Sequence, residues 1–163
     1  MVPELVVAGE EHKTLLQNLM QFYIYDFSEF IDLDVNMSGL YDPYKELQLY
    51  FEEKKQRFAY LIKEKDKYIG FVLIRVINAK PKPHFSVAEF FIMKKYRRKG
   101  RGKAIAIEIF NLHRGDWEVY QQQNNRPAFM FWKKTIGEYT SGHFSERVQD
   151  GKTIQILNSY HFD

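Results

Sequence analysis

The chain has 163 residues, 45% of them hydrophobic and 17% aromatic, which is typical of a folded domain and not of a disordered segment. The absence of cysteine excludes disulfide bonds, thiolate metal sites and a cysteine nucleophile. No apolar run approaches the roughly 18 residues that span a bilayer, and the first residues lack the regions of a signal peptide. We therefore expect a single domain over residues 1–163, located in the cytoplasm and without a membrane partner.

Periodicity and turn residues predict a chain of alternating short elements. In order, these are a strand at 5–8, a helix from 12 to about 27, a helix opened by Asp42-Pro43, strands at 58–63, 68–77 and 87–93, a helix at 103–113, a strand at 117–120, a helix with Pro127 in its first turn, and strands at 144–148 and 153–157. The first helix should bury a stripe formed by Leu15, Leu19, Phe22 and Tyr23. This order indicates a mixed α/β chain with a mostly antiparallel sheet.

Charge is distributed unevenly along the chain, although its formal net value is only +3. Seven of the ten residues from Lys94 to Lys103 are lysine or arginine, whereas the segment from Asp26 to Glu46 is rich in carboxylates. The first region suits an anion, and the second would tolerate a cation. The alternative for each is a solvated surface, which explains the basic run less well because that run also holds two glycines between a strand and a helix.

The segment 97–104, with the letters R-R-K-G-R-G-K-A, has the properties of an anion-binding loop. Glycines allow backbone N–H groups to turn toward a ligand, and the helix that follows adds partial positive charge at its N-terminus. A nucleotide P-loop is excluded because its first glycine position is Arg97 and its Ser/Thr position is Ala104. A dinucleotide fingerprint is excluded because its third glycine position is Ile105.

A third pattern fits this loop and a second segment downstream. Arg97-x-x-Gly100-x-Gly102 resembles the acetyl-CoA pyrophosphate loop of the GNAT N-acetyltransferases, and the run from Asn125 to Trp132 resembles the N-x-x-A-x-x-F-Y segment of that family. The resemblance covers residues from about 5 to about 160. It implies an α/β (α+β) fold in which a mixed, mostly antiparallel sheet of about seven strands is flanked by about four helices and splayed between its fourth and fifth strands.

The resemblance also implies that acetyl-CoA is the donor and CoA the product. The pyrophosphate would be held by backbone N–H groups of the loop, with Lys99 or Arg101 near the 3′-phosphate. The pantetheine arm would follow the strand end as a pseudo-strand, and an N–H near Phe91 or Ile92 would bind the thioester carbonyl. The residues expected to bind the cofactor are Phe91, Ile92, Met93, Arg97, Arg98, Lys99, Gly100, Arg101, Gly102, Lys103, Asn125 and Trp132.

Glu89 interrupts an otherwise apolar strand and is the candidate general base. A carboxylate among apolar neighbours has its charged form disfavoured by desolvation, so the pKa of Glu89 should be raised. That property suits a group that draws a proton from an ammonium acceptor. The alternatives are an edge or bulge carboxylate that faces solvent, or one that pairs with Arg75.

Trp132 occupies the position where the family has the tyrosine that protonates the leaving thiolate. An indole N–H donates a hydrogen bond but is no acid near neutral pH. Tyr139, seven residues further on, is a weak candidate for the acid; a water molecule or unassisted departure of the thiolate are the alternatives. Trp132 itself is interpreted as a packing residue at the thiol end of the cofactor.

The acceptor site is placed by the resemblance in the first helices, where Tyr23, Tyr25, Asp26 and Glu29 are the candidates. Aromatic rings and carboxylates together would hold a small cationic amine. Ordinary core packing with solvated carboxylates is the alternative. The five histidines show no spacing typical of a metal site, so no metal is expected.

The leading hypothesis for function is therefore an acetyl-CoA-dependent N-acetyltransferase that works by direct attack in a ternary complex, since no cysteine exists to carry the acetyl group. The expected acceptor is the primary amine of a small molecule, with a protein amine as an alternative, and the chain would act as a monomer or homodimer. A catalytically silent CoA-binding domain is the second hypothesis. A nucleic-acid module that uses the basic run is the third, and it is disfavoured because few aromatics interleave with those charges.

Overall fold

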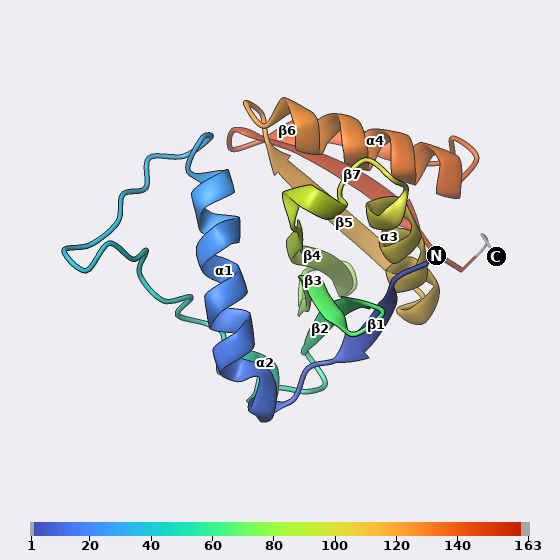
Figure 1. Ribbon diagram of the computed structural model, residues 1–163. Helices are drawn as coiled ribbons and strands as arrows, with labels where there is room; N and C mark the ends of the chain where they lie inside the picture. The colour runs from blue at the N-terminus through green and yellow to red at the C-terminus, as the bar shows by residue number, and fades with distance from the viewer. Residues whose placement is uncertain (1, 161–163) are drawn as a thin grey trace.

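The computed structural model describes residues 2–160, which form one seven-stranded sheet with helices on both faces (Figure 1). The strands are β1 (Glu4–Val7), β2 (Arg57–Glu64), β3 (Lys67–Ile77), β4 (His84–Ile92), β5 (Asp116–Gln122), β6 (Ser145–Gln149) and β7 (Lys152–Asn158). The α-helices are α1 (Lys13–Phe27), α2 (Leu49–Glu52), α3 (Arg101–Leu112) and α4 (Arg126–Tyr139), and two short 3-10 helices lie at Glu10–His12 and Lys94–Tyr96. None of the helices within the described residues is long and apolar enough to cross a membrane.

The sheet has the strand order β1-β2-β3-β4-β5-β7-β6. Its neighbours are antiparallel except for β4 and β5, which are parallel and pair only where they begin, Phe85 with Trp117 and Ser86 with Glu118. Beyond those two pairs the strands separate, which leaves the later residues of β4 without a neighbour on that side. The expected fold, with its sheet splayed between the fourth and fifth strands, is confirmed.

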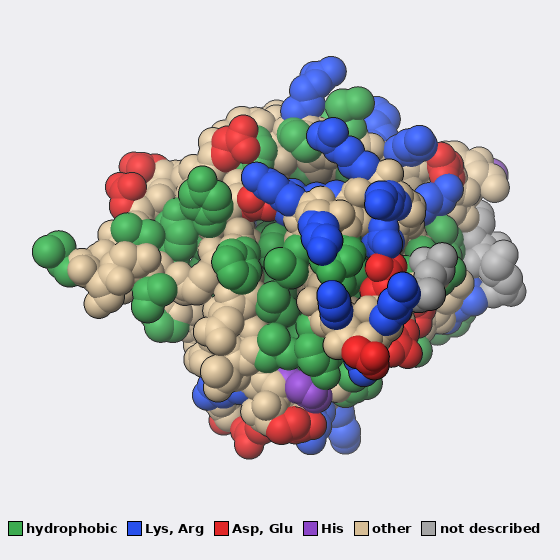
Figure 2. Space-filling model, in the orientation of Figure 1, with side chains coloured by type: hydrophobic (Ala, Val, Ile, Leu, Met, Phe, Trp, Pro, Cys, Tyr) green, Lys and Arg blue, Asp and Glu red, His purple; other side chains and the backbone are tan. Residues whose placement is uncertain are grey.

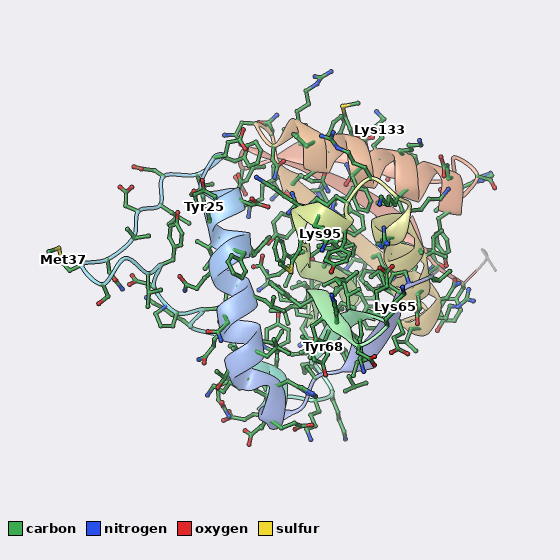
Figure 3. All side chains as sticks on the ribbon, in the orientation of Figure 1. Tyr25, Met37, Lys65, Tyr68, Lys95 and Lys133 are labelled. Atoms are coloured by element: carbon green, nitrogen blue, oxygen red, sulfur yellow. The ribbon has the colours of Figure 1, made fainter. Side chains whose placement is uncertain are left out.

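Two hydrophobic cores lie on opposite faces of the sheet. Leu16 and Met20 of α1 pack against β2 and β3 in one core, and Ile105, Ile109 and Trp132 from α3 and α4 pack against the other face. Alternation of side chains along the strands supplies both cores, because successive residues of a strand point to opposite faces. The loop that follows α1 extends away from this body (Figure 1), and Met37 lies at its tip (Figure 3).

The predicted stripe of α1 is correct except for Phe22. Leu19 is buried and Leu15 and Tyr23 pack against the same core, whereas Phe22 is 54% exposed. Leu16 and Met20, which the prediction left out, are also buried. The ring of Tyr23 packs against Phe71 and Phe91 of the sheet.

The second helix is much shorter than predicted. Asp42-Pro43 does not open a helix: residues 45–48 form turns, and α2 begins only at Leu49. The chain at Tyr41 is held instead by the Gln21 side chain on α1, which donates to the carbonyl of Tyr41 at 3.0 Å and accepts from its N–H at 2.9 Å. These two bonds keep the backbone extended before Tyr44 and bring that tyrosine over the sheet.

A β-bulge in β4 precedes Glu89. Leu73 of β3 pairs with Glu89 and Ile74 with Val87, so Ala88 is an extra residue without a partner. A bulge bends its strand and re-aims the side chains next to it. Here it lies at the point where β4 leaves β5, which places Glu89 at the start of the split.

Candidate active site

A cavity of about 570 Å³ occupies the split between β4 and β5. One wall is formed by α1 with Tyr23 and Phe27, and the opposite wall by α4 with residues from Pro127 to Thr135. The end of β4 and the loop before α3 form the remaining sides. The cavity is therefore mostly apolar along its length and basic at the end that faces the loop.

The loop before α3 has the conformation of an anion-binding nest. Arg98 and Gly100 both have positive φ angles, 63° and 76°, and α3 begins at the next residue. Residues in such conformations turn successive N–H groups to one side, and the helix N-terminus adds partial positive charge there. A side chain at Gly102 would be in tight contact with α4, because an added Cβ would lie 3.1 Å from a ring carbon of Phe131. The cavity wall thus approaches the helix backbone closely at this point.

Several of the basic side chains in the loop are already engaged by carboxylates. Arg97 donates to the carbonyl of Ile92 at 2.5 Å and to Asp26 of α1, and Arg101 forms two bonds of 2.6 and 2.8 Å with Glu64. Lys103 pairs with Glu138 of α4. These contacts fix the loop against α1, β2 and α4. Figure 2 shows that lysine and arginine side chains nevertheless gather on this face of the molecule.

Backbone groups at the end of β4 point into the cavity. The N–H of Met93 donates to the carbonyl of Ile69 on β3 at 2.9 Å. Because the two sides of a strand alternate, Phe91 also directs its N–H and carbonyl toward β3, while those of Phe90 and Ile92 point away from it. The carbonyl of Ile92 accepts from Arg97, in agreement with this alternation. Phe90 and Ile92 therefore carry the N–H groups that face the split, whereas Phe91 faces the sheet.

Glu89 is held by two tyrosines from segments far apart in the sequence. Tyr23 of α1 donates to Oε2, and Tyr44 of the loop before α2 donates to Oε1 at 3.2 Å. Burial raises the pKa of Glu89 above the ordinary glutamate value, and the two hydrogen bonds and the nearby Arg75 oppose that rise only in part. The carboxylate is thus partly buried and has no ion pair within the described chain, and its basicity exceeds that of a surface glutamate.

The pKa values of the tyrosine hydroxyls around Glu89 are also raised. Burial raises the pKa of Tyr23 well above its usual value, and the negative charge of Glu89 raises it further. Burial followed by the charge of Glu89 also raises the pKa of Tyr44 and of Tyr120. All three phenols therefore keep their protons at neutral pH and act as donors.

Asn125 and Trp132 have structural contacts in addition to lining the cavity. Asn125 is the N-cap of α4, where its Oδ1 accepts from the N–H of Ala128 at 3.2 Å. Trp132 is buried and packs edge-on against Phe90, with ring centroids 5.1 Å apart. Both residues line the cavity, and their predicted role in cofactor binding stays a prediction.

Some predicted site residues lie away from the cavity. The hydroxyl of Tyr139 donates to Asn111 at 2.8 Å, and its ring packs against Phe110 in the core beneath α3. Tyr25, labelled in Figure 3, is 66% exposed. Glu29 and Lys99 are also exposed. Among the predicted acceptor residues, Tyr23 and Asp26 line the cavity, although Asp26 is bound to Arg97 and also lies 3.3 Å from Lys94.

Sequence reasoning missed Tyr44, Lys134 and Phe90 at the site. Tyr44 could not be connected with Glu89 because 45 residues separate them, although a tyrosine in a polar, irregular segment was a possible signal. Lys134 and Phe90 line the cavity. Lys134 follows Pro127 by two helical turns, and that spacing could have placed both on one face of α4.

Comparisons with known proteins agree with this geometry. A family model described as "Acetyltransferase (GNAT) family" matches residues 19–137. An acetyltransferase from Thermus thermophilus superposes with a TM-score of 0.71 at 14% identity, over 97% of each chain. The PaiA N-acetyltransferase of Thermoplasma acidophilum, solved with coenzyme A, superposes at 0.64 and 13% identity, over 97% of this chain and 99% of that one.

A third structure carries an acceptor-type ligand. An aminoglycoside acetyltransferase from an uncultured soil metagenomic sample, solved with sisomicin, superposes with a TM-score of 0.64 at 14% identity, over 90% of this chain and 92% of that one. No curated protein sequence gives a significant match. At these identities the solved structures establish the fold.

Proposed function

The chain belongs to the acetyltransferase (GNAT) family, and we propose that it transfers the acetyl group of acetyl-CoA to a primary amine, with Glu89 as general base. The observation that carries this proposal is the position of a partly buried carboxylate of raised pKa at the start of the split, beside the cavity that the anion-binding loop closes. The chain has no cysteine that could carry the acetyl group, so the amine attacks directly.

The cavity fits the donor in charge and in shape. Acetyl-CoA carries an activated acyl group at one end and its phosphate groups at the other. The N–H groups from Arg98 to Lys103 and the N-terminus of α3 would hold the pyrophosphate, with Lys134 as a further cation on the rim. The missing side chain at Gly102 lets a ligand approach the helix backbone. The apolar wall of Phe90, Phe131 and Trp132 would exclude water from the acyl end.

The β4 backbone would complete the acyl site. The N–H groups of Phe90 and Ile92 face the split and are fixed by the strand, so they need no rearrangement to bind an oxygen that gains negative charge. We therefore propose Ile92 and Phe90 for this role, because Phe91, the other predicted donor, directs its N–H toward β3.

Glu89 acts on the acceptor. An amine is protonated near neutral pH and must lose a proton to become a nucleophile, and a carboxylate with a raised pKa accepts that proton more readily than a solvated one. Tyr23 and Tyr44 hold the two carboxylate oxygens and thereby fix its orientation.

Tyr23 is the phenol that lines the cavity and also touches Glu89. It would donate the proton that the family's tyrosine gives to the leaving thiolate, since Trp132 occupies that tyrosine's position here. While Glu89 is charged, it raises the pKa of Tyr23; once Glu89 has accepted a proton, that contribution disappears and the phenol becomes a better acid. Tyr23 then holds a transferable proton on the cavity side of the base.

The test is release of CoA thiol from acetyl-CoA in the presence of a panel of primary amines, with mass spectrometry of the products. Wild type should acetylate at least one amine, and Glu89→Gln should lower kcat/KM about 100-fold or more, as expected for a lost general base. Tyr25→Phe, an exposed change on the same helix as Tyr23, is the control and should keep full activity. Equal activity in wild type and Glu89→Gln would disprove the role of Glu89.

A CoA-binding domain without transferase activity is the second candidate. The packing of Trp132 in place of an acidic tyrosine favours it. Binding of CoA without turnover of any amine, in wild type and Glu89→Gln alike, would support this candidate.

A further inference from the structure

A second cavity, of about 700 Å³, lies over residues of β3, β4, β5 and β7. Arg75 of β3, Ser86 of β4 and Tyr120 of β5 form part of its lining, and we call it the Arg75 cavity. Arg75 lies two residues after Leu73, which packs in the core under α1, so both point to the same face of the sheet. Leu73 is the residue that pairs with Glu89.

The pairing of β3 and β4 sets the spacing between Arg75 and Glu89. Arg75 lies roughly 7 Å along β3 from the partner of Glu89, and one strand spacing of about 4.8 Å separates the two strands. Their long side chains are therefore close enough for charges to interact, and Arg75 lowers the pKa of Glu89 in part. The pKa of Tyr120, on the next strand, is raised by the charge of Glu89 and lowered by that of Arg75.

Arg75 is a cation of this cavity without an anionic partner. Lys82 pairs there with Asp116 at 2.6 Å and Arg147 with Glu118 at 2.8 Å, whereas Lys80 is an exposed lysine at the edge. Within residues 2–160, no carboxylate oxygen lies within 4.0 Å of the Arg75 guanidinium, and its Nε is buried without a hydrogen-bond partner. The residue is partly exposed and its hydrogen-bonding neighbour is the neutral Tyr120, so an incoming anion would supply the negative charge that the described chain does not.

A second unpartnered group lies nearby, in the lining of a separate cavity between α2 and the start of β2. The Tyr50 side chain is 97% buried, since the residue is only 3% exposed, and its hydroxyl has no hydrogen-bond partner among the described residues. Both Arg75 and Glu89 act on this hydroxyl, whose pKa burial raises to about 12. The phenol keeps its proton and is a neutral donor.

We propose that Arg75 binds a carboxylate of the acceptor, so that the acceptor is an amino acid or a similar small amine that carries its own carboxylate. Its ammonium group would face Glu89 and its carboxylate would face the Arg75 guanidinium. This inference rests on the proposed function and specifies its substrate class. It also explains why the carboxylates near α1 are not needed to hold the substrate, since Asp26 already binds Arg97.

The experiment compares free amino acids with their carboxamides, which have the same shape without the negative charge. Glycine, alanine, leucine and lysine, each with its amide, are assayed by thiol release from acetyl-CoA in wild type and Arg75→Ala. The ratio of kcat/KM for acid over amide is then compared between the two proteins, which cancels the difference in amine basicity. Arg75→Ala should lower this ratio at least about tenfold, through KM for the acids, with the amides unaffected.

Two further variants separate binding from folding. Arg75→Lys keeps the charge and loses the bidentate hydrogen-bonding geometry. Its acid-over-amide ratio should lie between those of wild type and Arg75→Ala, even if Arg75→Ala melts at a lower temperature. Lys133→Ala removes one positive charge from the opposite side of the sheet, on α4 (Figure 3), and should leave the ratio unchanged. An equal loss of acid and amide turnover in Arg75→Ala and in Arg75→Lys would overturn the proposal, because it indicates a purely structural role.

A calorimetric titration of the same amino acids into the CoA-saturated protein tests the carboxylate site separately from the transferase activity. Acetylation of amides or plain amines in preference to acids, in wild type, overturns the carboxylate site and leaves the transferase intact. Binding of amino acids that is lost in Arg75→Ala, without turnover of any amine, supports the site and refutes the transferase. Absence of both binding and turnover of amino acids overturns the site.

Discussion

Removal of the Tyr23 hydroxyl should raise the pKa of Glu89. Tyr23 donates to the carboxylate, and this bond lowers the pKa because it stabilises the charged form. A hydrogen bond to a charged group contributes about 1.5–3 kcal/mol. One pKa unit corresponds to about 1.4 kcal/mol. Tyr23→Phe should therefore raise the pKa of Glu89 by about one to two units above its wild-type value.

Tyr44→Phe supplies a graded comparison. The Tyr44 bond is a longer contact, 3.2 Å, so its loss should raise the pKa by less. Carbon-13 NMR titration of protein labelled at the glutamate carboxyls measures the pKa directly, with the Glu89 signal assigned by its absence in Glu89→Gln. Tyr25→Phe should leave the titration unchanged. A Glu89 signal that titrates at the same pH, or lower, in Tyr23→Phe than in wild type would refute the reasoning.

Two other predictions concern stability and the loop. Glu89→Gln should raise the melting temperature at pH 8 but not below about pH 4. The pKa of Glu89 is raised in the folded state, so its charged form lowers the stability of the fold once the pH rises above that pKa. Calorimetry at pH 8 and at pH 4 checks this, and a larger gain in melting temperature at the lower pH would contradict it. Gly100→Ala places a side chain at a φ of 76°, a strain of about 1–2 kcal/mol, and should weaken CoA binding about fivefold or more. Gly39→Ala introduces the same strain at a φ of 75° in the loop after α1, so equal CoA affinities for both variants would refute a special role for Gly100.

The local parts of the site could be predicted from the sequence because their signals are local. The order of strand, basic glycine loop and helix predicted an anion site, and Pro127 marked the first turn of α4. Glu89 stood out because it was the charged residue in an apolar strand. Each of these inferences depends on neighbours within a few residues, where conformational preferences are strong.

The long-range parts could not be predicted in the same way. The contact of Tyr44 with Glu89 depends on the extended chain that Gln21 holds at Tyr41, and no spacing in the sequence indicates that contact. The engagement of Arg97 by Asp26 joins residues 71 positions apart. The predicted helix at Asp42-Pro43 was wrong because such side-chain bonds to the backbone outweighed local helix preference.

The most direct test of the central claim is a calorimetric titration of CoA and acetyl-CoA into the purified protein at two salt concentrations. The account predicts binding of one molecule per chain at both salt concentrations, weakened in a combined Arg98→Ala and Gly100→Ala variant and retained in Tyr25→Phe. The absence of binding by wild type would contradict the assignment of the split as the donor site, and with it the transferase.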